Sequence, residues 1–300
     1  MISFHPVTLC DKPWVDEIVS KENSPSADYN FGNIYIWDKH YRQLICRLGD
    51  RMLTKLRYDG KPAFVFPVGS GELRPAIEAL REFAAYRGYP FCLRGITEKH
   101  REMLERQYPG RFDYTEDGDN FDYIYSAEKL SSYAGKSLHG KKNHCNRFEA
   151  ENDWDFVPLS RELIPRCLDM LAFWSEENAA RLDGSISYEH DAIIRAFAAF
   201  ESLGLDGGVL RAGGKILGFT IGELSCGNTF DVHFEKAEPA VNGAYPMVCR
   251  EFTRMLMKKY PLLQYMNRED DMGLDALRIS KQSYKPEYLL KKYTARWRYD

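Results

Sequence analysis

The sequence lacks the regularly spaced cysteines and histidines that hold metals or form disulfide frameworks. Its seven cysteines are odd in number and scattered, with no Cys-x-x-Cys pair, and its seven histidines include no His-Glu-x-x-His. Isolated cysteines of this kind are typical of free thiols in a reducing compartment. We therefore predict no zinc site, no disulfide scaffold and no bound metal ion.

Long apolar runs and an excess of one charge are also absent. No uninterrupted apolar stretch approaches the roughly 18–20 residues that a membrane helix needs, and the N-terminus lacks the basic and then apolar order of a signal peptide. Lysine and arginine number 41 against 44 aspartates and glutamates, a net charge of −3. This balance excludes nucleic-acid binding through bulk charge. We expect a soluble cytoplasmic protein in which any contact with a polyanion is local.

What the sequence does contain is enough apolar material for a sizeable core. Three hundred residues, 44% hydrophobic and 14% aromatic, suffice for one large domain or two ordinary ones. Apolar spacing predicts one order of elements twice: a strand, two helices, three antiparallel strands, a helix, a strand, a helix and one or two strands. Because the repeat lies in element order and not in residues, we predict an α+β protein of two similar domains, residues 1–126 and 127–300.

Within this scheme, corresponding elements should match between the two halves. A clear amphipathic helix over 72–87 is expected to correspond to one over 244–259. Residues 127–152 are expected to form a basic helical bridge that opens the second domain, and residues 288–297 a final strand. The sheets are expected to be mixed, mainly antiparallel and flanked by helices.

A strand, a loop and a helix follow one another between residues 231 and 260. The strand reads Asp-Val-His-Phe-Glu-Lys, and its alternation predicts that Asp231, His233 and Glu235 share one face. A helix N-terminus attracts anions, so the helix that follows can help to build a pocket. An acid, an imidazole and a second acid beside such a pocket favour acid–base catalysis, and a solvated strand face is the alternative.

A basic stretch precedes this segment. Between Glu128 and Glu149 no acidic residue occurs, whereas lysines, histidines and an arginine stand at Lys136, His139, Lys141, Lys142, His144 and Arg147. We expect the stretch to bind a polyanion: a tRNA acceptor end, a phosphorylated acceptor or the phosphates of coenzyme A. A solvated basic helix is the alternative.

Two further polar groups follow the helix over 244–259. Asn267, Glu269 and Asp270 stand between a predicted strand and a helix, where they could recognise the ammonium of an aminoacyl group or, for an aspartate, cap the helix. We expect Asp231, His233 and Glu235 to line a cavity together with Asn267, because the neighbouring strand of a sheet lies only about 4.8 Å away.

The second group lies nearer the C-terminus. Arg278 and Lys281 are three residues apart and share a helix face. With Tyr284 and Lys285 they are expected to clamp a phosphate or to steady a carbonyl oxygen during transfer. A solvated basic face is the alternative. If this group and the basic stretch serve one anionic donor, they should lie on one rim of the cavity, since screening limits the reach of exposed charges to about 8 Å.

Three segments carry a resemblance to a known family. They read Gly135-Lys-Ser-Leu-His-Gly-Lys-Lys-Asn-His-Cys-Asn-Arg-Phe, then Asp231-Val-His-Phe-Glu-Lys-Ala with Asn242-Gly-Ala-Tyr, then Asn267-Arg-Glu-Asp-Asp-Met-Gly-Leu-Asp-Ala-Leu-Arg with Lys281-Gln-Ser-Tyr-Lys-Pro. As a set they resemble the C-terminal domain of phosphatidylglycerol lysyltransferases and its soluble stand-alone relatives, which have no assigned function. The element order resembles two GCN5-related N-acetyltransferase (acetyltransferase-like) folds in tandem, as in Fem-type aminoacyltransferases.

The resemblance implies an acyltransferase with its cleft in the second domain. The activity expected is transfer of an aminoacyl group from a charged tRNA to a small amine or hydroxyl acceptor, with no tightly bound cofactor. Glu235, His233, Asp231 and Lys281 would be catalytic, and Tyr245 would join the two polar groups in binding substrate. The sequence carries no membrane-spanning flippase part, which argues against a lipid acceptor.

Two alternatives remain open. One is a coenzyme-A-dependent N-acetyltransferase, although the loop after Glu235 only approximates the Gln/Arg-x-x-Gly-x-Gly/Ala motif of that class. The other is a non-catalytic binding module on a degenerate transferase fold.

Overall fold

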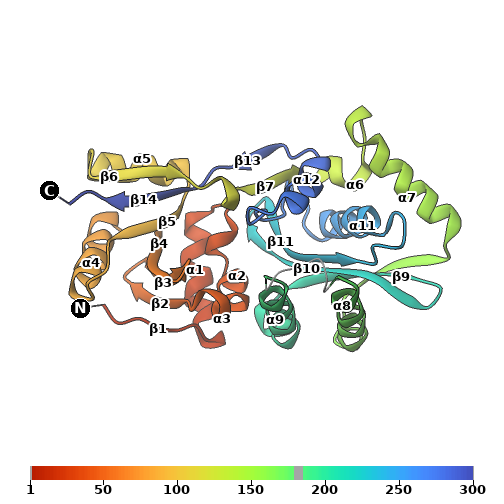
Figure 1. The fold of residues 1–300 in the computed structure, drawn as a ribbon, viewed down its shortest axis with the longest axis horizontal. Coiled ribbons are helices and arrows are strands. Elements are labelled where there is room, and N and C mark those ends of the chain that lie inside the picture. Colours follow the sequence, from red (N-terminus) through yellow and green to blue (C-terminus); the bar gives the residue numbers. More distant parts are fainter. Residues whose placement is uncertain (1, 179–184, 300) are drawn as a thin grey trace. The chain divides into compact units, whose positions relative to one another are not determined.

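The computed structural model of the protein describes residues 2–178 and 185–299, which form two compact units (Figure 1). The first unit comprises Met1–Asp122, Asp270–Gly273 and Leu289–Asp300, and the second comprises Tyr123–Glu269 and Leu274–Tyr288. The units are therefore not contiguous in sequence. Residues 289–300, which we expected in the second domain, belong to the first unit.

The first unit is built on a seven-stranded sheet in the order β1-β2-β3-β4-β5-β14-β6. Its strands are β1 (His5–Pro6), β2 (Leu44–Leu48), β3 (Arg51–Tyr58), β4 (Lys61–Gly69), β5 (Cys92–Ile96), β14 (Tyr293–Trp297) and β6 (Phe112–Glu116). Its helices are α1 (Lys12–Glu22), α2 (Phe31–Ile36), α3 (Asp38–Tyr41), α4 (Leu73–Tyr86) and α5 (Glu98–Gln107). Neighbouring strands are antiparallel except β4 and β5, which α4 connects in parallel.

The second unit repeats this plan with the order β13-β7-β12-β11-β10-β9-β8. Its strands are β13 (Tyr288–Leu290), β7 (Asp122–Ser126), β12 (Tyr265–Asn267), β11 (Thr229–Ala237), β10 (Lys215–Cys226), β9 (Asp206–Ala212) and β8 (Trp154–Pro158). Its helices are α6 (Ala127–Ser132), α7 (His139–Glu151), α8 (Ile164–Asn178), α9 (Ser185–Ala198), α10 (Phe200–Leu203), α11 (Ala244–Lys259) and α12 (Asp275–Ser283). Helix α11 covers one face of the sheet, and α8 and α9 cover the other (Figure 1).

Each sheet contains one strand from the other half of the chain. Strand β7 ends the first half of the chain but lies between β12 and β13, and β14 ends the second half but lies between β5 and β6. The single final strand predicted over 288–297 is therefore wrong, because β13 and β14 join different sheets. Apolar alternation predicts that a segment is extended. It does not indicate which strand the segment pairs with, because the partner lies far away in the sequence.

The two helices predicted to correspond, α4 and α11, occupy equivalent places in the connectivity of the two units. Helix α4 connects β4 to the parallel strand β5, and α11 connects β11 to the parallel strand β12. The bridge over 127–152 is not one helix: α6 ends at Ser132, the next residue Tyr133 has φ +48°, and Gly135 at φ +95° precedes a short turn and α7. Both segments pack on α11, whose buried residues share a core with Phe148 and Leu130.

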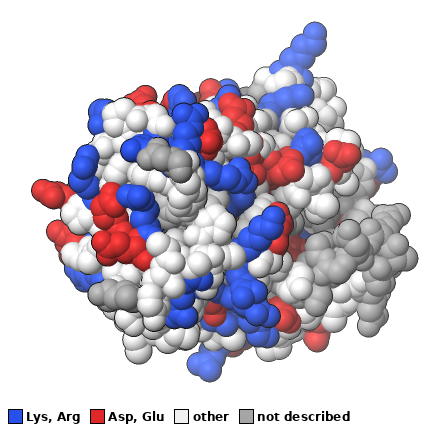
Figure 2. All heavy atoms as spheres, turned by 60° about the vertical axis from the view of Figure 1, so that its left-hand side comes forward, with Lys and Arg blue, Asp and Glu red and all other residues white. Residues whose placement is uncertain are grey.

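The surface carries charges of both signs. Figure 2 shows lysine and arginine interspersed with aspartate and glutamate over the face drawn, in keeping with the nearly balanced composition. Among the residues that the structure describes, no helix is long and apolar enough to span a bilayer.

Acid should destabilise the first unit through Glu22, a buried carboxylate. Burial raises its pKa, but His100, Lys99 and the N–H of Gly69 bond to it and lower the pKa to about 2 overall. The unfolded chain then binds more protons than the folded one, so stability falls as the pH drops from about 5 to 2, by roughly 3 kcal/mol. Urea unfolding at several pH values should show this loss, and Glu22→Gln should flatten it.

The control is Glu17, whose exposed carboxylate pairs with Lys21. Glu17→Gln should change the acid dependence far less, because solvent screens the exposed pair with Lys21 that lowers the pKa of Glu17. If Glu22→Gln and Glu17→Gln behaved alike, the depressed pKa of Glu22 would not be a source of the acid sensitivity.

Candidate functional site

The two parallel strands of the second sheet separate at residues that the sequence analysis singled out. Strand β11 pairs with β12 only over Thr229–Asp231, opposite Tyr265–Asn267, and then continues to Ala237 paired with β10. Strand β12 ends at Asn267, and the backbone of Arg268 and Glu269 bonds to Tyr123 of β7. The last part of β11 is therefore open on its β12 side to side chains from other elements.

A β-bulge at His233 changes the predicted orientation of the polar residues on β11. In the antiparallel pairing with β10, Phe234 lies opposite Ile221 and Val232 opposite Gly222, which leaves His233 as the extra residue. A Cβ at Gly222 would lie 2.0 Å from the carbonyl oxygen of Asp231, so only glycine allows this close approach.

The bulge places Glu235 on the opposite face of the sheet from Asp231 and His233. Val232 belongs to the core under α11, so its neighbours Asp231 and His233 point away from α11. Past the bulge, Lys236 points to Trp174 of α8, with its Nζ 4.0 Å from the ring centroid. Glu235 therefore points toward α11, and the prediction that all three polar side chains share one face is wrong.

On the α11 face, Glu235 is the carboxylate of a buried ionic group that we call the Glu235 cluster. Its other members are Arg268, Lys141, Lys281 and Tyr284. The Arg268 guanidinium donates to Glu235 Oε1 at 2.7 Å, and the two side chains are 12% and 8% exposed. The Nζ of Lys141 lies 3.8 Å from the centroid of the Tyr284 ring, and the Arg268 guanidinium carbon lies 4.5 Å from it. Lys281 donates its Nζ–H to the backbone carbonyl of Arg268.

The Glu235 cluster has more positive than negative charge. Burial raises the pKa of Glu235 above its ordinary value, although Arg268, Lys141 and Lys281 oppose this shift. Burial and the charge of Arg268 lower the pKa of Lys141. Burial disfavours the charged form of Arg268, but Glu235 together with Cys249 and the nearby tyrosines outweighs it and keeps the pKa of Arg268 well above its ordinary value.

Two buried polar atoms beside this carboxylate have no hydrogen-bond partner within the described part of the chain. They are Nη1 of Arg268 and Oγ1 of Thr220, which stands directly opposite Glu235 in the β10–β11 pairing. A buried donor without a partner is costly. An anionic oxygen bound here would accept from Arg268 and lie among the cations of the cluster.

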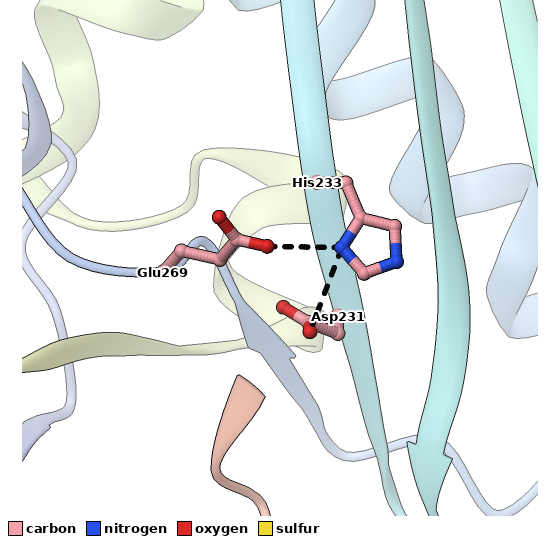
Figure 3. Close-up of side chains that lie close together, drawn as sticks. All are labelled: Asp231, His233 and Glu269. Carbon is pink, nitrogen blue, oxygen red and sulfur yellow. Dashed lines mark hydrogen bonds and ion pairs between the residues drawn. The ribbon is translucent and has the colours of Figure 1, made fainter. Parts of the chain in front are cut away.

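On the other face, His233 is surrounded by carboxylates (Figure 3). Its Nδ1 lies 2.9 Å from Glu269 Oε1 and 3.7 Å from Asp231 Oδ2. Its Nε2 lies 3.1 Å from Glu223 Oε1. Burial lowers the pKa of His233, but the bonds to Glu223 and Glu269 outweigh it and raise the pKa well above its ordinary value. An imidazolium that donates both N–H groups has no lone pair for a proton. The geometry thus favours a structural role for His233 over that of a base.

The N-terminus of α11, which we expected to attract anions, is covered by α7. Gly243 has φ +89°, and a Cβ there would lie 2.5 Å from the carbonyl oxygen of His144 and 3.0 Å from Cβ of Phe148. The His144 ring nitrogen Nδ1 also lies 2.6 Å from Oδ1 of Asn242. Gly243 and Ala244 are buried. The end of the helix is therefore part of the packed core and not an open anion site.

Gly243→Ala tests this packing. The added methyl would clash with α7 and occupy a backbone conformation that L-residues rarely adopt, so the free energy of unfolding should fall by roughly 2–4 kcal/mol. Urea unfolding followed by circular dichroism measures it. Gly140→Ala is the matched control, because Gly140 lies in α7 and a methyl added there would have nothing within 4 Å of it. It should stabilise the protein by about 0.5–1 kcal/mol; equal effects of the two changes would refute the close contact.

The other residues predicted in the two basic groups are not members of the Glu235 cluster. The short turn Lys136–Leu138 and helix α7 expose Lys136, His139, Lys142 and Arg147, and Arg147 pairs with Glu151 at 2.8 Å. Arg278 is 3.6 Å from Asp275, and Lys285 is exposed. Of the two groups expected on one rim, Lys141, Lys281 and Tyr284 thus contribute to the Glu235 cluster.

Three polar residues predicted near the cavity lie in different environments. Asn267 is buried and accepts the N–H of Glu269 at 2.7 Å. Asp270 belongs to the first unit, where its carboxylate accepts the N–H of Met272. The hydroxyl of Tyr245 accepts the Trp174 indole N–H at 3.2 Å.

Arg268, Thr220 and Glu223 were not among the predicted site residues. Arg268 stands inside the quoted Asn267-Arg-Glu-Asp motif, and its position directly after an apolar strand was the available signal. Thr220 alternates with Phe219 and Ile221 in β10 and carried no local signal. Glu223 stands on the face of the strand that Phe219 and Ile221 share, and this break in the apolar alternation was the available signal.

Comparison with known proteins identifies relatives over nearly the whole chain. A protein of unknown function from Bacteroides thetaiotaomicron is 35% identical, with a TM-score of 0.94 over 99% of this chain and 100% of that one. The L-PGS of Bacillus licheniformis is 16% identical, with a TM-score of 0.67 over 99% of this chain and 94% of that one. FemX is 9% identical, with a TM-score of 0.61 over 97% and 96%. The likeness to the last two shows the fold, and the expected tandem acetyltransferase-like architecture is confirmed.

A curated relative is an uncharacterised protein of Mycoplasmoides gallisepticum, 26% identical over 57% of this chain and 54% of its own length. The matched region thus spans about half of that relative. The family model described as phosphatidylglycerol lysyltransferase, C-terminal, matches residues 21–296. Its match covers the β11–α11 segment, the Glu235 cluster and the residues around His233. The chain therefore belongs to the family of the C-terminal domain of phosphatidylglycerol lysyltransferases.

Proposed function

We propose that the protein is an aminoacyltransferase, which moves an aminoacyl group from a charged tRNA to a small acceptor with an amine or a hydroxyl. The observation that carries the proposal is the Glu235 cluster, in which Arg268, Lys141 and Lys281 surround one buried carboxylate where β11 and β12 separate. The aminoacyltransferase-like fold supports it. Catalysis of acyl transfer needs donors aimed at the charge that develops on the carbonyl oxygen, and this cluster offers them.

The chemistry that we assign to the cluster is attack on an ester. The acceptor nitrogen or oxygen forms a bond to the carbonyl carbon, and the electron pair of the C=O bond moves to oxygen. Nη1 of Arg268, which has no partner in the described structure, and the ammonium of Lys141 hold that oxyanion. Glu235 takes the proton of the acceptor. The bond from carbon to the terminal ribose oxygen of the tRNA then breaks, and the ribose oxygen receives the proton.

The surroundings of α7 and α11 favour tRNA over coenzyme A as the donor. A pyrophosphate is well held at an open helix N-terminus, but α7 covers that end of α11 through Gly243 and Phe148. The exposed cations Lys136, Lys142 and Arg147 suit the spaced phosphates of a nucleic-acid backbone. The burial of Glu235 and Arg268 favours an acceptor small enough to bring its reacting group between them.

The test is a transfer assay with two labelled donors. The protein is incubated with tRNA charged with each of the amino acids in turn, or with acetyl-coenzyme A, and with small amines, hydroxyl compounds or phosphatidylglycerol vesicles as acceptors. We expect the label to leave tRNA for a small product that resists ribonuclease. Transfer from acetyl-coenzyme A alone would overturn the proposal in favour of an N-acetyltransferase. Binding of charged tRNA without transfer to any acceptor would overturn it in favour of a binding module.

A further inference from the structure

A second group of chemistry-bearing side chains lies on the face of the sheet away from the Glu235 cluster. It consists of His233 and Asp231 on β11 and Glu269 just after β12 (Figure 3). The proposed transfer chemistry does not use these residues. We propose that Asp231, His233 and Glu269 bind one divalent first-row transition-metal ion, with Mn²⁺ and Zn²⁺ as the fitting ions.

The spacing of the three ligand atoms fits such an ion. One atom from each residue lies within 4.8 Å of the others. His233 Nδ1 is 2.9 Å from Glu269 Oε1 and 3.7 Å from Asp231 Oδ2. Ligands bound about 2.0–2.2 Å from one ion lie about 2.8–3.6 Å apart at octahedral or tetrahedral angles. The two distances to Nδ1 are close to that spacing, and the oxygens of Asp231 and Glu269, which lie within 4.8 Å of each other, would have to approach by about 1 Å at most.

The far side of the imidazole has the partner that metal-binding histidines usually have. Nε2 of His233 lies 3.1 Å from Oε1 of Glu223, which stands opposite Asp231 in the β10–β11 pairing. A ligating histidine commonly donates its other ring N–H to a carboxylate, which fixes the ring and leaves the first nitrogen to the metal. With Nε2–H donated to Glu223, Nδ1 faces Asp231 and Glu269.

The ligand types decide the class of ion. One imidazole nitrogen with two carboxylates suits Mn²⁺, Fe²⁺ or Zn²⁺, whereas Ca²⁺ and Mg²⁺ prefer oxygen ligands alone. The side chains of Asp231 and His233 are fully buried, and that of Glu269 is 18% exposed, so Glu269 forms the entry. Binding replaces the proton on Nδ1 and releases it.

The ion would connect β11 to the residue that follows Arg268. It would therefore fix the backbone on both sides of the point where β11 and β12 separate, and with it the position of Arg268 against Glu235. The site stands on its own geometry and does not depend on the transfer activity.

Metal binding is measured on the full chain prepared free of metal, with Mn²⁺ followed by electron paramagnetic resonance and Zn²⁺ by calorimetry. We expect one ion per chain and a melting temperature raised by roughly 5–10 °C at a hundredfold excess over Kd. His233→Gln and Glu269→Gln should each weaken binding by at least about 100-fold. Glu223→Gln should weaken it by about 10–100-fold. Mg²⁺ should not compete at equal concentration.

His5→Gln is the matched control, because His5 lies 3.7 Å from Asp11 at the surface of the first unit. It should leave the affinity unchanged. Glu269→Gln keeps the test decisive if His233→Gln fails to fold, since the Glu269 side chain lies at the edge of the group. Absence of binding by the wild-type chain, or equal binding by Glu269→Gln, would overturn the site and leave the transfer proposal untouched.

Discussion

Replacing Lys141 by Met should lower kcat for aminoacyl transfer by about 10²–10³-fold, the usual effect of removing one donor from an oxyanion site. The Lys141 ammonium lies over the Tyr284 ring beside Arg268 and Glu235, where burial keeps water from substituting for it. Methionine retains most of the side-chain volume, so the packing on Tyr284 should persist. Single-turnover transfer from charged tRNA separates this loss in the chemical step from changes in donor binding.

Lys142→Met is the neighbouring comparison. Lys142 is exposed, one residue further along α7, and its charge can act only on the donor backbone. We expect KM for charged tRNA to rise about two- to threefold at physiological salt while kcat stays the same. If the two variants lost the same fraction of kcat, or if Lys141→Met changed only KM, Lys141 would not contact the reacting ester.

Glu235→Leu should lower the free energy of unfolding by about 3–5 kcal/mol, because it removes the carboxylate of a buried ion pair. The change leaves Arg268, Lys141 and Lys281 facing one another without their common anion. Arg268→Met should cost less, about 2–3 kcal/mol, because Lys141 and Lys281 remain near Glu235. The double variant should cost less than the sum of the two. Urea unfolding of all four proteins, followed by near-ultraviolet circular dichroism, measures the coupling.

An exposed pair in the same unit provides the reference. Lys129 and Glu287 form an ion pair whose side chains are 55% and 40% exposed. Their double-mutant cycle should give about 0.2–1 kcal/mol. A coupling between Glu235 and Arg268 no larger than this would mean that water screens their cluster, and it could not then serve as the preorganised site that we propose.

Local patterns in the sequence were sufficient for the elements of the second unit. The alternation after residue 229 predicted β11, the apolar spacing after Gly243 predicted α11, and both lie where expected. The element order predicted the repeated fold as well. Whether a segment is helical or extended depends on residues within one or two turns of each other, so the apolar period of the sequence indicates it directly.

Pairing between distant segments was not predictable in the same way. Strands β7 and β14 are extended as expected, but each completes a sheet whose other strands are far away in sequence. The bulge at His233 depends on Gly222, which admits the carbonyl oxygen of Asp231 across the β10–β11 pair. The alternation of residues along β11 alone therefore does not predict the bulge.

The residue types available for chemistry can be read directly from the sequence: the acids and imidazole on β11, the basic stretch before β8, and the polar residues at and after the end of β12. Their grouping depends on the folded chain. The bulge separated Glu235 from His233, and folding brought Arg268 and Lys141 to Glu235 across intervals of 33 residues or more. The physical reason is that composition and period are local properties of a chain. Burial of a charge beside its partner requires a register, a bulge and a helix packing that only the whole fold fixes.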